Sequence, residues 1–206
     1  EEKVLDKFEE LGEITNISES KTKNEDLISN IVDTEIVVIR SGTKINKDIL
    51  ENANNLKIIA RCGVGVDNVD VEEATNKKIY VTNSPNANII SVAELTIGLI
   101  ISAARKIHVS NNSLKDKKWD RNKFLGTELY QKQLGLVGFG KAAKEVAKRL
   151  SAFGMNIVFY DPYVDSSTIE AKKVDLDELL KTSDVISIHV VKTEETTNLI
   201  NNEKLN

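Results

Sequence analysis

Two glycines and one aspartate carry the clearest chemical signal in the sequence. Gly138 and Gly140 separate an apolar stretch, residues 134–137, from an amphipathic stretch with lysines on its polar side. A glycine turn between a strand and a helix lets the backbone approach a pyrophosphate, which binds N–H groups at the helix N-terminus. Asp161 ends the next apolar stretch, 23 positions (161 − 138) after Gly138. This is close to the ~20 positions expected for the acid that binds ribose hydroxyls, so the spacing predicts a dinucleotide site.

The same residues indicate which dinucleotide is bound. The third position of the glycine fingerprint holds Ala143, which the fingerprint accepts. An acid at the ribose position repels the additional phosphate of NADP, so NAD is the expected cofactor. A purely structural strand–turn–helix is the alternative, because glycine pairs before helices are common. Asp161 at the end of the second strand favours the nucleotide interpretation. No metal site is predicted.

A second group of candidate residues follows the strands of the first half of the chain. Strands are predicted at 35–40, 56–60 and 78–83, and helices at 1–11, 24–32 and 47–53. Strands that alternate with helices predict a parallel sheet with helices on both faces. Ligands bind such sheets beyond the carboxyl ends of the strands. These ends carry Arg40, Gly63, Val64, Gly65 and Asn83.

The second half of the chain predicts another unit of the same class. A long helix is expected from Ser91 to about Ile107, followed by a polar segment in which Trp119 and Phe124 could contact a neighbouring element. Strands at 134–137, 156–161 and 185–190 and a helix at 176–181 complete the pattern. The fold class is therefore α/β, with two doubly wound parallel-sheet domains. The predicted domains are residues 1–90 and residues 91–206.

Composition excludes several classes of partner. With 40% hydrophobic and 29% charged residues and a net charge of −4, the 206-residue sequence is that of an ordinary globular protein without a basic footprint. Nucleic acid and membrane are not expected partners. The one cysteine, Cys62, cannot form an internal disulfide, which fits the cytoplasm, and is interpreted as a packing residue rather than a catalytic thiol. The chain lacks an initial methionine and is expected to be a piece of a longer protein.

Motifs along nearly the whole chain, in the correct order, resemble the D-2-hydroxyacid dehydrogenases. They are RSGTKI (40–45), RCGVGVDNVD (61–70), NSPNANIISVAELTIGLI (83–100), KDKKWDRNKFLGTEL (115–129), LGLVGFGKAA (134–143) and VISIHV (185–190). The resemblance implies a flavodoxin-like substrate domain, made by both chain ends, and an inserted Rossmann dinucleotide domain. It also implies reversible hydride transfer between C2 of a 2-hydroxy acid and NAD. RSGTKI together with GVGVDNVD points to a phosphorylated 2-hydroxy acid, D-3-phosphoglycerate.

The resemblance also implies roles for individual residues. The expected substrate-binding residues are Arg40, Ser41, Gly63, Val64 and Gly65, where the glycine segment offers backbone N–H groups to the substrate carboxylate. Arg61 would add positive charge, and a surface ion pair remains the alternative for Arg40. The expected cofactor-binding residues are Val64, Gly138, Gly140, Lys141, Ala142, Asp161, His189 and Val190.

No catalytic residue is expected within this chain. The resemblance places the family's catalytic arginine, glutamate and histidine beyond Asn206, so the chain alone should not turn over substrate. His189 is expected beside the cofactor rather than as the base, and His108 at a solvated surface or an interface. A homodimer, or a higher homo-oligomer, is implied through the helix after Ser91 and the segment around Trp119. Two alternatives stay open: a dehydrogenase for another 2-hydroxy acid, such as glycerate or lactate, and a non-catalytic NAD-sensing binding module.

Overall fold

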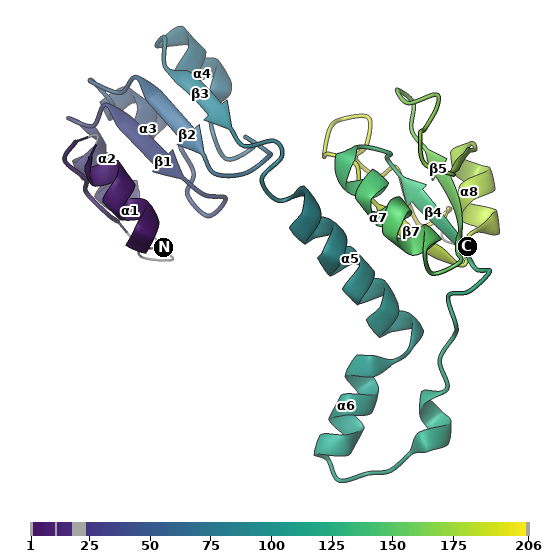
Figure 1. Cartoon of the computed structure of the whole chain (residues 1–206). Coiled ribbons are helices and arrows are strands. Elements are labelled where there is room, and N and C mark those ends of the chain that lie inside the picture. Colours follow the sequence, from purple (N-terminus) through teal and green to yellow (C-terminus); the bar gives the residue numbers. More distant parts are fainter. Residues whose placement is uncertain (1, 11, 18–23, 205–206) are drawn as a thin grey trace. The chain divides into compact units, whose positions relative to one another are not determined.

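The computed structural model describes residues 2–10, 12–17 and 24–204. The chain divides into two compact units, residues 1–88 (unit 1) and residues 89–206 (unit 2) (Figure 1). The first and last residues of the helix predicted at 1–11, and Asn206, lie outside the described residues. The predicted first helix is present as α1, Glu2–Glu9.

Unit 1 contains a three-stranded parallel sheet in the order β1-β2-β3. The strands are β1 (Ile36–Ile39), β2 (Ile58–Arg61) and β3 (Tyr80–Asn83), and the remaining helices are α2 (Asn24–Ile31), α3 (Lys47–Asn52) and α4 (Val71–Asn76). The sequence analysis missed α4. Its six residues bury one side chain, Ala74, so it shows no apolar periodicity. The side chain of Asp70 caps its N-terminus by accepting a hydrogen bond from the Glu73 N–H.

The core of unit 1 lies on one face of this sheet. Ile39 and Ile59 are buried there with side chains of α2, α3 and α4. Side chains alternate between the faces of a strand, and the alternate residues of β1, Ile36 and Val38, are 54% and 44% exposed. The packing of these side chains therefore anchors the sheet from one side.

Unit 2 contains a four-stranded parallel sheet in the order β6-β5-β4-β7. The strands are β4 (Gln133–Val137), β5 (Asn156–Tyr160), β6 (Lys172–Lys173) and β7 (Val185–Ile188). The helices are α5 (Ile89–Ala104), α6 (Ile107–Lys115), the 3-10 helix η1 (Arg121–Phe124), α7 (Lys141–Ser151) and α8 (Leu176–Thr182). The chain leaves β4 toward β5 on one side and reaches β7 on the other, so the strand order reverses at β4. Ligands bind open α/β sheets at such a reversal point.

The middle strand β4 shows why both faces of this sheet are covered. Leu134 and Leu136 are fully buried in a core shared with α5 and α7. Val137 points to the other face and packs with Leu176 and Leu179 of α8. Figure 1 shows α7 and α8 on opposite sides of the strands. The predicted α/β fold with parallel sheets is confirmed.

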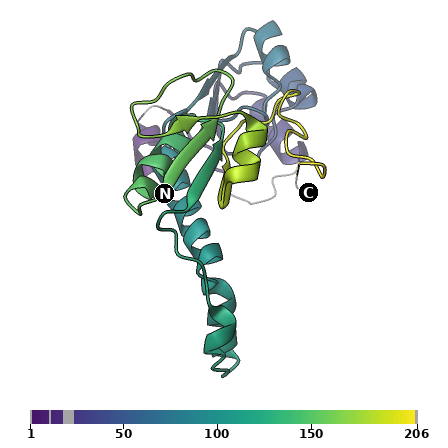
Figure 2. The ribbon, with the colours of Figure 1, turned by 90° about the vertical axis from the view of Figure 1, so that its right-hand side faces the viewer.

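The long helix after the first unit ends earlier than predicted. α5 stops at Ala104, and Lys106 adopts a left-handed conformation with φ 53° before α6 begins. After α6 and η1 the chain returns to the end of α5, where the Thr127 N–H donates a hydrogen bond to the Ala104 carbonyl at 2.8 Å. The intervening segment extends away from the sheet of unit 2 (Figure 2, lower teal part), and Trp119 in it is 80% exposed. None of the described helices, α5 included, has the length and apolar character to cross a membrane.

Candidate cofactor and substrate sites

The first position of the turn after β4 requires glycine for two separate reasons. Gly138 has a positive φ of 87°, which L side chains rarely adopt. A Cβ atom here would lie 2.8 Å from Cγ1 of Val190 and 3.0 Å from the carbonyl oxygen of His189. The Gly138 N–H donates to the Tyr160 carbonyl at 2.8 Å. Gly138 therefore brings the ends of β4, β5 and β7 into close contact.

The second glycine leaves a helix N-terminus open. Gly140 is the N-cap residue of α7, and no side chain caps this terminus. A Cβ atom at Gly140 would have nothing within 4 Å. The N–H groups of the first helical turn, which begins with Lys141 and Ala142, have no acceptor within the helix. They therefore suit an anionic group such as a pyrophosphate, and this open terminus fits NAD.

Asp161, directly after β5, is bonded to the backbone of two segments. One carboxylate oxygen, Oδ2, accepts a hydrogen bond from the Phe139 N–H at 2.7 Å. The other, Oδ1, accepts from the N–H groups of Tyr163 at 2.8 Å and Val164 at 3.1 Å. A carboxylate has about four lone-pair positions, so it retains acceptor capacity for a ribose hydroxyl while holding the turn.

Phe139 is a residue of this site that the sequence analysis did not single out. It stands between the two glycines, is fully buried and stacks on Phe159 of β5, with ring centroids 3.9 Å apart and an interplanar angle of 14°. The ammonium group of Lys144 lies 5.7 Å from its ring centroid. The pattern of an aromatic residue between two glycines could have indicated this role from the sequence, because a buried ring can hold a flexible turn in place.

The histidine and valine after β7 form another wall of the turn. The His189 N–H donates to the Val137 carbonyl at 2.7 Å, and the Nε2 atom of its ring lies 3.0 Å from the Ser187 hydroxyl. Burial lowers the pKa of His189, because the charged imidazolium loses hydration. The ring is therefore neutral near pH 7. Cγ1 of Val190 lies 2.8 Å from the position that a Cβ atom of Gly138 would take, so Val190 packs against the turn.

In unit 1, the ends of neighbouring strands bring the other candidate residues together. Ile39 pairs with Arg61 across β1 and β2, so Arg40 follows one strand end and Arg61 forms the next. Asn83, at the end of β3, donates its side-chain amide to the Val64 carbonyl at 2.7 Å. The Ser84 N–H donates to the Gly63 carbonyl at 2.8 Å. These bonds fix the glycine segment against β3.

The glycine segment of unit 1 also shapes the position of Arg61. A Cβ atom at Gly63 would lie 1.4 Å from Nη1 of Arg61, so the guanidinium group occupies the space beside this glycine. The Gly63 N–H already donates to the Arg61 carbonyl at 2.9 Å. Cys62 is exposed. Its interpretation as a packing residue is wrong, because it directly follows β2, where the chain leaves the core.

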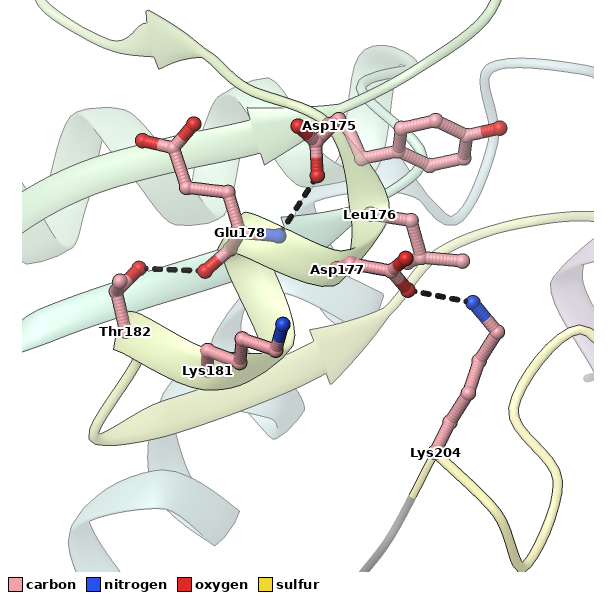
Figure 3. Close-up of a pocket in the computed structure, with 8 residues that line it drawn as sticks. Asp175, Leu176, Asp177, Glu178, Lys181, Thr182 and Lys204 are labelled. Atoms are coloured by element: carbon pink, nitrogen blue, oxygen red, sulfur yellow. Dashed lines mark hydrogen bonds and ion pairs between the residues drawn. The ribbon is translucent and has the colours of Figure 1, made fainter.

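A depression of about 650 Å³ lies beside α8 (Figure 3). Its polar groups are bonded to one another: Asp177 pairs with Lys204 at 2.7 Å, and Asp175 accepts from the Glu178 N–H at 2.7 Å as the N-cap of α8. Three carboxylates line it, which disfavours a phosphate group. The glycine turn is therefore the better cofactor site.

Comparison with known proteins gives a family for the second half of the chain. Residues 97–206 match the protein family described as "D-isomer specific 2-hydroxyacid dehydrogenase, NAD binding domain". A D-3-phosphoglycerate dehydrogenase of Methanocaldococcus jannaschii is 48% identical, over 96% of this chain and 38% of the relative. A hydroxypyruvate reductase of Thermotoga maritima is 46% identical, over 92% of this chain and 62% of the relative.

A solved structure agrees with this match. The D-lactate dehydrogenase of Aquifex aeolicus, in complex with NAD and lactic acid, has a TM-score of 0.78 and 31% identity. The similarity covers 90% of this chain and 55% of that one. The chain spans less than two thirds of the length of each of these relatives.

Proposed function

Because the chain belongs to the D-isomer specific 2-hydroxyacid dehydrogenases, whose NAD binding domain residues 97–206 match, we propose that the whole protein oxidises D-3-phosphoglycerate to 3-phosphohydroxypyruvate. This is the first step of serine biosynthesis. Bound NAD supplies the hydride acceptor. The observation that carries the proposal is the 48% identity to the Methanocaldococcus jannaschii relative over 96% of this chain. Arg40, which follows β1, and Arg61, which ends β2, support a substrate with two anionic groups.

We assign NAD binding to residues 91–206 and substrate binding to residues 1–90. In the NAD-binding part, the amides of Lys141 and Ala142, the uncapped N-terminus of α7, bind the pyrophosphate. Asp161 accepts hydrogen bonds from the ribose hydroxyls and repels an additional phosphate, which selects NAD. Gly140 leaves the space for this approach. His189 and Val190 border the adenosine.

In the substrate-binding part, the cations recognise the negative groups of the substrate. Guanidinium groups bind carboxylates and phosphates through two parallel hydrogen bonds. Arg40 and Arg61 fill this role, with Ser41 and the N–H groups of Val64 and Gly65 completing the site. Gly63, whose N–H donates to the Arg61 carbonyl, contributes the space beside the Arg61 guanidinium. Val64, which is 39% exposed, borders the nicotinamide.

The alternatives differ in substrate or in chemistry. The Thermotoga maritima relative is named a hydroxypyruvate reductase, which favours a dehydrogenase for glycerate or another unphosphorylated 2-hydroxy acid as the second candidate. A non-catalytic NAD-sensing binding module remains the alternative from another class. A substrate without a phosphate group needs fewer cations in its binding site than a phosphorylated one. The two arginines therefore favour phosphoglycerate over glycerate or lactate.

We further propose a cytoplasmic homodimer that associates through α5 and the segment around Trp119. In unit 2, Leu95 and Leu99 of α5 are 65% and 61% exposed and Trp119 is 80% exposed, so a partner chain would cover apolar surface. Sedimentation of the whole protein tests this. We expect Leu99→Lys to shift it from dimer to monomer, and an unchanged dimer would exclude this surface.

The first experiment combines the intact mass of the purified whole protein with NADH production from D-3-phosphoglycerate, D-glycerate and D-lactate. We expect turnover with D-3-phosphoglycerate and a much lower kcat/KM for the two unphosphorylated acids. A preference for D-glycerate would replace the substrate assignment. NADH binding without turnover of any of the three acids would favour the binding module.

A further inference from the structure

The side chain of Asn68 connects three segments of unit 1. It is a buried polar side chain, only 8% exposed. Its Nδ2 group donates to the carbonyl oxygens of Arg40 at 3.0 Å and Thr43 at 2.6 Å. Its Oδ1 atom accepts a long hydrogen bond, 3.5 Å, from Nε of Arg61. One amide therefore links the turn after β1, the end of β2 and the loop that contains Asn68.

The backbone around Asn68 holds this amide in a fixed place. The Asn68 carbonyl accepts from the Ile45 N–H at 2.9 Å, and the Asp70 N–H donates to the Ile45 carbonyl at 2.8 Å. Ile45 is fully buried, so the loop is attached to the core on both sides of Asn68. A buried amide without partners is costly. The bonds of Asn68 make its orientation, and with it the position of its partners, well defined.

We infer that Asn68 is a positioning residue for substrate binding: it holds the guanidinium of Arg61 and the turn that begins at Arg40 in one arrangement before substrate arrives. The inference rests on the proposed function. With Nε bonded to Asn68, Arg61 keeps the N–H groups of Nη1 and Nη2 for an anion. A side chain that is already ordered loses less entropy on binding. Asn68 therefore acts on substrate affinity through Arg61 and Arg40, without touching the cofactor site.

The test measures the whole protein and its Asn68→Ala and Asn68→Ser variants. We expect KM for D-3-phosphoglycerate to rise about 3- to 10-fold, the effect of freeing one long side chain, with kcat and KM for NAD unchanged. Calorimetric titration of D-3-phosphoglycerate should show the same loss of affinity. Asn68→Ser retains a small polar group, so it provides a folded variant if Asn68→Ala does not fold.

A matched control separates positioning from stability. Ile79 is 6% exposed and precedes β3, at the opposite end of the sheet. Ile79→Val should lower the melting temperature and leave KM unchanged. A lower melting temperature of the Asn68 variants with unchanged KM and affinity would overturn the inference, as would an equal rise in KM for NAD.

The wild-type protein distinguishes this result from a failure of the proposed function. If the wild type oxidises D-glycerate or D-lactate instead, the substrate assignment fails, and the same variants are compared on the accepted acid. If it oxidises no 2-hydroxy acid, the proposed function and the inference both fall.

Discussion

The carboxylate of Asp161 accepts a hydrogen bond from the backbone N–H of Phe139 at 2.7 Å. The residue expected to bind ribose is thereby attached to the turn expected to bind pyrophosphate. Phe139 is itself held by its stacking on Phe159 of β5. The acid and the turn therefore behave as one rigid element at the ends of β4 and β5, and a change at either should affect both stability and cofactor affinity.

Replacing Asp161 by alanine should weaken NADH binding. The variant loses a charged acceptor for ribose and leaves the N–H groups of Phe139, Tyr163 and Val164 without this partner. Hydrogen bonds to charged groups are each worth about 1.5–3 kcal/mol, so we expect the NADH dissociation constant to rise about 10- to 100-fold in a fluorescence titration. Asp177→Asn, which removes an exposed carboxylate paired with Lys204, is the control and should bind like the wild type. Equal affinities of Asp161→Ala and the wild type would exclude Asp161 from the site.

The two glycines of the turn should respond differently to alanine. Gly138→Ala forces a positive φ on a side chain and a contact with Val190 and His189, so we expect a loss of about 1–3 kcal/mol in the free energy of unfolding. Gly140→Ala meets no atom within 4 Å and should keep wild-type stability. Its methyl group occupies space needed by a pyrophosphate, so NADH binding should weaken. Chemical denaturation and NADH titration of both variants check this, and a stable Gly140→Ala with unchanged NADH affinity would place the pyrophosphate elsewhere.

His189 should make the protein less stable as the pH falls. Burial lowers its pKa in the folded state, so the unfolded chain binds the proton more readily. The stability contributed by the neutral ring is complete above the unfolded pKa of about 6.5 and is lost as the pH falls toward the folded pKa. We expect the melting temperature of His189→Gln to fall less between pH 7.5 and pH 5 than that of the wild type. His108→Gln, at an exposed position of α6, is the control and should keep the wild-type slope. Parallel slopes for the wild type and His189→Gln would contradict this assignment.

Alanine at Gly63 should displace Arg61. The new Cβ would take the place of the guanidinium, whose Nη1 lies 1.4 Å from that position. Gly63 also has a φ of 157°, at which a side chain is strained, so we expect a loss of about 1–3 kcal/mol in the free energy of unfolding. The side chain of Arg61 is long enough to move, so KM of the folded variant for D-3-phosphoglycerate should rise about tenfold or more. Gly42→Ala, whose Cβ would meet nothing within 4 Å, is the control in the turn after β1. An unchanged KM for Gly63→Ala would show that this position of Arg61 does not matter for the substrate.

Local sequence was sufficient where a pattern lies within one segment. The apolar runs of β1, β2, β4 and β5 predicted strands. In β4 and β5 these runs are buried, as continuous apolar residues in parallel strands usually are. The spacing from Gly138 to Asp161 predicted their association, because a strand–helix–strand unit has a nearly constant length. The helix end at Ala104 was not predicted. The apolar residues keep a helical spacing from α5 into α6, so the sequence pattern gives no sign of the left-handed Lys106 that separates the two helices.

The tertiary structure decided the contacts between segments that are far apart in the sequence. The Asn68 amide meets the Arg40 carbonyl across 28 positions, and the Asp161 carboxylate meets the Phe139 N–H across 22. Each contact depends on which strands are neighbours and on their register. The side chains themselves allow many other partners. The sequence by itself therefore determined the α/β class and the glycine turn with its aspartate, through local propensity and spacing. Only the folded sheets determined which polar groups hold these elements together, because hydrogen bonds form between groups that packing has already brought within about 3 Å.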